Sequence, residues 1–252
     1  MQGMISEERL YRGMEDMAES ALSVFRNERK YLVPWGKAVS MRGKFDEILS
    51  RDRHSGTSGY VVRSLYFDSI NNVDYKTKLS GVEKRKKIRI RSYPPGIGTC
   101  KLELKEKYGD RQQKISLRIS KEDVERLSRL DYGVLTKYFD ESQAAVKIYT
   151  EMVMGGYRPV ALVEYDRVAY TYPLYNTRIT LDMNLRGSEG NLDLFDEEPL
   201  YTVFMQEEMV LEVKYDQRLA RFISDILKQY HLTQCSVSKY CIGRKIFCDF
   251  EF

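Results

Sequence analysis

Hydrophobic and charged residues alternate along five segments of the chain. Successive side chains of a β-strand point to opposite faces, so each segment separates into an apolar face and a charged face. The charged faces comprise Lys87, Arg89 and Arg91; Lys101, Glu103, Lys105 and Lys107; Lys114, Ser116 and Arg118; Arg178, Thr180 and Asp182; and Glu212 and Lys214. One such segment is typical of a sheet with one face in water. Five segments with the same arrangement predict one shared charged surface.

Turn and capping signals predict the other elements. Strands are expected at 23–33, 60–68, 84–93, 99–107, 111–119, 157–172, 177–186 and 205–215, and helices after Pro34, from Ser120, at 140–154, near 219–227 and at 238–247. Ser120 and Asp123 have the spacing of a capping box, and Gly109-Asp110 predicts a hairpin turn. In the helix after Pro34, the apolar positions are Trp35, Ala38, Val39, Phe45, Ile48 and Leu49. The short connections predict mostly antiparallel strands.

The apolar stripes of the helices need a surface to cover, and the apolar strand faces provide one. With the helices outside, the charged faces point inward when the sheet closes into a barrel. The sequence therefore predicts an α+β fold in which a β-barrel encloses a polar tunnel. Residues 1–22 are assigned to an N-terminal segment that could be helical, and residues 23–252 to a single domain.

Composition narrows the class of protein. The 252 residues include 41 Lys+Arg and 37 Asp+Glu, for a net charge of +4, and 42% are hydrophobic, as is typical of a globular chain. No apolar run reaches the roughly 20 residues that span a bilayer, and the polar N-terminus does not resemble a secretory signal. The protein is therefore expected to be cytoplasmic, without membrane insertion. The alternation and the small net charge also disfavour nucleic-acid binding.

The predicted charged surface suits a chain of phosphates and a divalent cation. Basic side chains on neighbouring strands, about 4.8 Å apart, can hold successive phosphates. Glu28, Glu103 and Glu212 would repel phosphate, but their oxygens can hold Mg²⁺ or Mn²⁺. Phosphoryl transfer needs mainly positioning and charge neutralisation. The sequence therefore predicts a metal-dependent enzyme that acts on a polyanionic phosphate.

Other site chemistries find less support. The chain has no G-x-x-x-x-G-K-[ST] loop, and Gly96-Ile97-Gly98 follows two prolines as expected for a turn. His231, Cys235 and Cys241 do not have the spacing of a common zinc site. The four cysteines are irregularly spaced, which argues against a disulfide framework.

Eight short motifs follow one another along the chain. They are Glu28-Arg29-Lys30-Tyr31, Ser64-Leu65-Tyr66-Phe67-Asp68, Lys87-Ile88-Arg89-Ile90-Arg91, Glu103-Leu104-Lys105, Tyr165-Asp166-Arg167, Arg178-Ile179-Thr180-Leu181-Asp182, Glu212-Val213-Lys214 and Ser238-Lys239-Tyr240. This ordered set resembles the vacuolar transporter chaperone (VTC) domain of the triphosphate tunnel metalloenzymes, over about residues 24–245. The resemblance implies a closed eight-stranded antiparallel β-barrel tunnel and a polyphosphate polymerase that moves the γ-phosphate of ATP to a polyphosphate chain and releases ADP.

The resemblance also implies roles for individual residues. The catalytic set comprises Lys30, Arg89, Arg91, Lys105, Arg167, Arg178 and Glu212. Further phosphate-binding residues are Lys87, Lys114, Tyr165, Lys214 and Lys239, of which Lys114 and Lys214 rest partly on their place on the charged faces. Glu212 corresponds to the principal ligand of the Mn²⁺ or Mg²⁺ cofactor, with Glu28 and Glu103 as further carboxylates. The expected partners are ATP and inorganic polyphosphate, and a membrane protein could move the product.

Two departures from the family pattern bear on the activity. The triphosphatase branch opens with Glu-x-Glu-x-Lys, whereas the corresponding residues here are Arg26, Glu28 and Lys30, which favours the VTC branch. Ser236 stands three residues before Lys239, where the polymerase often has another lysine. Two alternatives stay open: a triphosphatase acting on inorganic or nucleoside triphosphate, and a non-catalytic module that binds polyphosphate.

Overall fold

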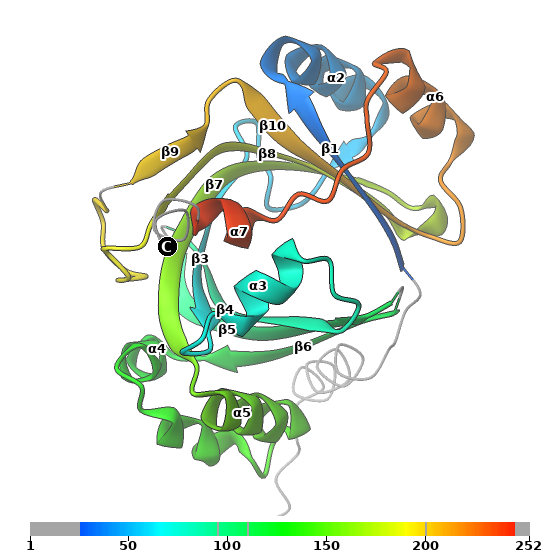
Figure 1. Cartoon of the computed structure of the whole chain (residues 1–252). Coiled ribbons are helices and arrows are strands. Elements are labelled where there is room, and N and C mark those ends of the chain that lie inside the picture. Colours follow the sequence, from blue (N-terminus) through cyan, green and yellow to red (C-terminus); the bar gives the residue numbers. More distant parts are fainter. Residues whose placement is uncertain (1–25, 95, 110, 200, 245–252) are drawn as a thin grey trace, which may run out of the picture.

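The computed structural model describes residues 26–244 except positions 95, 110 and 200. The predicted N-terminal segment 1–22, the start of the first strand and the end of the last predicted helix lie outside these residues. Within them, the chain forms an antiparallel sheet that curls into a half-barrel with helices on both sides (Figure 1). No helix of this described part is long and apolar enough to cross a membrane.

Eight strands form the main path of the sheet. In spatial order they are β1 (Arg26–Pro34), β10 (Glu208–Asp216), β8 (Thr177–Ser188), β7 (Arg158–Tyr172), β3 (Tyr60–Asp68), β4 (Arg85–Tyr93), β5 (Gly96–Tyr108) and β6 (Arg111–Ile119). Two short strands extend the sheet, β2 (Ser50–Arg51) beside β7 and β9 (Thr202–Met205) beside β8. The strand predictions are confirmed to within a few residues, and β5 and β6 form the predicted hairpin. β9 is a strand that the pattern did not separate from its neighbour.

The prediction of a closed barrel is wrong, because the sheet is open between β1 and β6. Instead of pairing with β6, the outer edge of β1 binds a segment near the C-terminus: the Cys235 amide donates to the Lys30 carbonyl (2.9 Å), and Tyr31 forms a β-bridge with Gln234. Alternation along a strand assigns its faces but carries no information about which edges pair. The contacts of Gln234 and Cys235 therefore had no signal in the pattern.

In the described residues, four α-helices and one 3₁₀ helix cover the convex side, where the helices were predicted to pack. α2 (Trp35–Ile48) and α6 (Arg221–Gln229) cover β1, β10 and β8, whereas α4 (Lys121–Ser128), α5 (Gln143–Gly155) and the 3₁₀ helix η1 (Tyr132–Tyr138) cover the β4–β6 part. Ser120 and Asp123 form the predicted capping box. α5 is capped at its C-terminus by Gly156, whose φ of 57° favours glycine. α2 buries Ala38, Met41 and Phe45, while the apolar residues Trp35, Val39 and Ile48 of the same helix are exposed.

Two short helices lie on the concave side, contrary to the prediction that all helices pack outside. α3 (Val73–Leu79) and α7 (Lys239–Gly243) pack against each other within the curl of the sheet (Figure 1). An apolar cluster joins them to the inner sheet face through Tyr66, Val163, Tyr165 and Tyr240. The 3₁₀ helix η2 (Leu174–Asn176) connects β7 to β8. The concave side is thus apolar where α7 packs and charged elsewhere.

Candidate functional site

The charged strand faces enclose a cavity of about 410 Å³ on the concave side of the sheet. Nine cationic side chains line it: Lys30, Lys87, Arg89, Arg91, Lys105, Lys114, Arg167, Lys214 and Lys239. Two carboxylates, Glu28 and Glu212, share this lining. The structure therefore brings together most of the predicted site residues, and gives the cavity a large excess of positive charge.

The strand register places like charges directly opposite one another. Lys87 of β4 lies opposite Lys105 of β5, and Lys105 in turn lies opposite Lys114 of β6. Like charges in directly opposed positions destabilise a sheet, by roughly the 0.2–1 kcal/mol that an opposite-charge pair contributes. An arrangement that costs stability in the free protein indicates that an anion binds these lysines.

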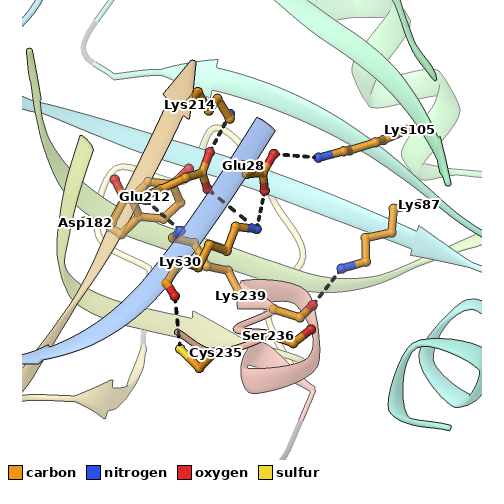
Figure 2. A network of polar contacts seen from close by, with 12 residues as sticks. Glu28, Lys30, Lys87, Lys105, Asp182, Glu212, Lys214, Cys235, Ser236 and Lys239 are labelled. Atoms are coloured by element: carbon orange, nitrogen blue, oxygen red, sulfur yellow. Dashed lines mark hydrogen bonds and ion pairs between the residues drawn. The ribbon is translucent and has the colours of Figure 1, made fainter. Parts of the chain in front are cut away.

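Glu28 and Glu212 form the acidic centre of the cavity (Figure 2). Lys30 lies between them, with Nζ 2.7 Å from the Glu28 carboxylate and 3.6 Å from that of Glu212. Burial and the Glu212 charge raise the pKa of Glu28, but the surrounding lysines outweigh both and lower it to about 2. Burial also opposes ionisation of Glu212, yet Lys214 and Lys30 hold its pKa well below the usual value. Both carboxylates are therefore ionised at neutral pH.

These two carboxylates fit a divalent cation. Mg²⁺ is commonly held by one or two protein carboxylates together with phosphate oxygens and water, and Glu28 and Glu212 offer such a pair beside the phosphate-binding cations. Glu103, the third predicted metal ligand, does not join them. Within the described residues, no group of three or more His, Cys, Asp or Glu side chains is arranged to hold a metal ion. A metal would therefore depend on phosphate oxygens to complete its ligands.

Two further carboxylates lie behind the cations. Glu103 contacts Arg89 (2.8 Å) and Lys114 (3.0 Å), and its Oε2 lies 3.7 Å from Arg91. Burial raises the pKa of Glu103, but Arg89 and Arg91 outweigh it and lower the pKa far below its usual value. Glu103 therefore holds the two arginines of β4 in fixed positions facing the cavity.

Asp182 has the same function on the other side of the cavity. This fully buried carboxylate accepts hydrogen bonds from Arg167 Nε (2.6 Å) and Nη2 (2.8 Å), and pairs with Lys239 (2.6 Å). Sequence reasoning placed Asp182 on a charged face but gave it no role in the site. Its position on the same face as Arg178 was the available signal. The sequence does not show which cations pair with Asp182, because β7, β8 and α7 meet only in the folded chain.

Tyrosines separate and orient the cations. Arg89 donates to the Tyr66 hydroxyl (3.1 Å), and Lys239 Nζ lies 4.9 Å from the centre of the Tyr165 ring. Burial raises the pKa of Tyr165, but Arg167 and Arg91 outweigh it and leave the pKa lowered. Tyr165 thus lies among positive charges, as its predicted role in phosphate binding requires. Tyr66 was not predicted as part of the site.

A buried polar network positions α7 and therefore Lys239. Tyr240 donates a hydrogen bond to Asp68, and its ring stacks on Tyr66 with centroids 5.1 Å apart. Asp68 also accepts backbone hydrogen bonds from Asp74 and Tyr75, at 3.0 Å each, at the start of α3. The Asp68 carboxylate therefore joins β3, α3 and α7 at one point.

Lys87 lies next to α7, apart from the Glu28–Glu212 pair (Figure 2). Its Nζ donates to the Ser238 hydroxyl (2.6 Å). Burial lowers the pKa of Lys87 to about 7; Cys241 opposes this shift, and three neighbouring lysines add to it. Burial likewise lowers the pKa of Lys105, to about 8, although Glu28 opposes the shift. Not all cations of the cavity are therefore permanently charged at neutral pH.

Arg178 is the one predicted site residue among the basic ones that does not line this cavity. It pairs with Asp52 and donates to the Tyr60 hydroxyl (3.2 Å). The Tyr60 ring lies 6.0 Å from that of Tyr93, at the end of β4. Arg178 therefore belongs to the edge of the site.

An open antiparallel half-barrel around a basic, carboxylate-bearing cavity defines a class of domain that binds triphosphate or polyphosphate. The family comparison is specific: the VTC domain matches residues 25–248, and the chain belongs to this family. None of the curated proteins compared with the sequence matches it.

Two solved structures match the chain at low sequence identity. One, described as a "putative adenylate cyclase" from Bacillus halodurans, has a TM-score of 0.50 and 13% identity, with 85% of this chain and 96% of that chain covered. The PH1819 protein from Pyrococcus horikoshii OT3 has a TM-score of 0.45 and 16% identity, with 85% and 95% covered. At these identities the first likeness supports the fold alone.

Proposed function

We propose that this VTC-domain protein is a polyphosphate polymerase that transfers the γ-phosphate of ATP to a growing inorganic polyphosphate chain and releases ADP. The observation that carries the proposal is the concave cavity, in which nine cations surround two ionised carboxylates. The cations can neutralise and orient consecutive phosphates. When Mg²⁺ or Mn²⁺ is bound by Glu28 and Glu212, it supplies further neutralisation of phosphate charge.

The residues of the cavity supply positioning and charge neutralisation. Arg89, Arg91 and Arg167 present guanidinium groups, each of which can donate two parallel hydrogen bonds to phosphate oxygens. Glu103 and Asp182 already hold these groups in place, so little side-chain freedom is lost on binding. In the transfer step, a terminal oxygen of the polyphosphate chain attacks the γ-phosphorus. The bond between that phosphorus and the β–γ bridging oxygen breaks, and its electron pair leaves with ADP.

The proposal is tested by incubating the purified protein with ATP and Mg²⁺ or Mn²⁺ and following the reaction by phosphorus NMR. We expect the internal-chain phosphate signal to grow in step with ADP, and Glu212→Gln to abolish both. Lys44→Ala is the matched control, because Lys44 lies on α2 and donates to Gln229 (2.8 Å). Orthophosphate without internal-chain phosphate would contradict the polymerase and favour the triphosphatase. An unchanged spectrum with intact triphosphate binding would favour the binding module.

A further inference from the structure

A second cavity, of about 500 Å³, adjoins the first. The two cavities share Glu28, Lys30, Lys87, Lys105, Gln112 and Val237 in their linings. The second cavity adds four cations, Lys78, Arg85, Lys86 and Lys107, and no carboxylate besides Glu28. The ratio of cations to carboxylates is therefore higher in the second cavity than in the first. A ligand that extends out of the first cavity on this side meets this lining.

Three of the added cations lack an acidic partner in the described part of the chain. Lys78 donates to Ser236 (2.7 Å) and Arg85 donates to the Val82 carbonyl (3.0 Å), and neither forms an ion pair there. Lys107 of β5 lies directly opposite Arg85 of β4, so two like charges face each other. Lys86 differs, because its ammonium pairs with Glu151 of α5. Lys78, Arg85 and Lys107 are thus half-buried cations without a neutralising group.

Cationic side chains on one face of β4 form a continuous row that runs through both cavities. Arg85, Lys87, Arg89 and Arg91 occupy alternate positions on the same strand face, about 6.7 Å apart, so the row spans roughly 20 Å. This row is longer than a triphosphate. Beyond Arg91, the Tyr93 ring lies against the Tyr60 ring, so the row of cations ends there. The row continues in the opposite direction, toward Arg85.

We propose that the second cavity binds the part of a phosphate chain that extends beyond the first cavity, with Lys78, Arg85 and Lys107 as its contacts. This inference rests on the proposed function only in that the first cavity binds phosphates. The Lys78 ammonium is held beside Ser236, which also lines the second cavity. The described lining contains no aromatic side chain on which a nucleobase could stack, which favours inorganic polyphosphate over a nucleic acid.

The test compares two ligands of different length. Isothermal titration calorimetry in the presence of Mg²⁺ measures the binding of inorganic tripolyphosphate and of long-chain polyphosphate to the full chain. For Lys78→Met combined with Lys107→Met, we expect triphosphate affinity to stay within about twofold and long-chain affinity to fall by about tenfold. The dependence of long-chain affinity on salt should also weaken, because two phosphate contacts are lost. Lys37→Met combined with Lys44→Met, on the outer helix α2, is the charge-matched control.

Several results would overturn the inference. Equal losses for both ligands, or no loss for either, would do so, as would equally tight binding of a single-stranded oligonucleotide. Lys78→Arg combined with Lys107→Arg should restore long-chain affinity; failure of this variant, with an unchanged melting temperature, would also contradict the inference. If the wild type binds the long chain through Lys78 and Lys107 but makes no polymer, only the polymerase proposal fails. If it makes polymer and the methionine variant binds both ligands normally, only the second site fails.

Discussion

Lys87 should take up a proton when phosphate binds. Its ammonium lies beside Ser238 and among Lys30, Lys78 and Lys105, and burial lowers its pKa to about 7. At about pH 8 only about one-tenth of the molecules carry a proton on Lys87. Phosphate oxygens favour the charged form, so saturation of the cavity by triphosphate should raise this pKa and draw the missing proton from solution.

The size of the effect follows from the pKa. Complete protonation of Lys87 corresponds to an uptake of about 0.9 proton at about pH 8 and of about 0.25 proton at about pH 6.5. Arginine stays protonated at both values, so Lys87→Arg should lack this uptake. As the pH rises from about 6.5 to about 8, the triphosphate affinity of the wild type relative to that of this variant should fall by about eightfold. The reason is that Lys87 of the wild type must first take up a proton.

Calorimetry in two buffers with different ionisation enthalpies measures the uptake directly. The difference between wild type and Lys87→Arg cancels the titration of the triphosphate itself. A difference near zero at about pH 8 would refute the reasoning, because it would mean that Lys87 is already charged in the free protein or stays neutral in the complex. Binding of sulfate, which is fully ionised across this range, provides an independent check.

Three further predictions follow from the site. Arg89→Ala should weaken triphosphate binding by about tenfold or more, whereas Lys44→Ala should leave it unchanged in the same titration; equal losses would contradict the location of the site. Asp182→Asn leaves two buried cations without their charge partner, so urea unfolding should show a loss of about 3 kcal/mol, and a stable variant would refute the pairing. Tyr240→Phe removes the hydrogen bond to Asp68 and should cost about 1–2 kcal/mol in the same assay, with weaker triphosphate binding because α7 is displaced; unchanged binding would contradict the positioning role of the helix.

Much of the cavity could be predicted because its residues obey one local rule. The alternation of side chains along a strand was enough to place Arg89, Arg91 and Lys105 on the charged face, and in the structure all three line the cavity. The same rule placed Arg178 there as well, but Arg178 lies at the edge with Asp52. The alternation shows to which face of its strand a side chain points, but it does not show where along the curled sheet that side chain lies.

The contacts that the alternation of side chains could not predict involve elements far apart in sequence. Tyr240 and Asp68 are 172 residues apart, and their hydrogen bond holds α7 on the concave side. Five-residue helices such as α7 carry too few apolar positions to show which surface they cover. The open edge of β1 escaped prediction for a related reason, since the Cys235 amide that covers it belongs to no strand of the sheet.

The gap between β1 and β6 changes how a polymer can reach the cavity. In a closed barrel, a long chain must be threaded through an end. Here, a side-chain ion pair between Glu28 and Lys105 (3.3 Å) links β1 to β5 across the opening, in place of a ladder of backbone hydrogen bonds. Separating β1 from β5 at this point therefore breaks one ion pair between side chains and no backbone hydrogen bond of the described sheet.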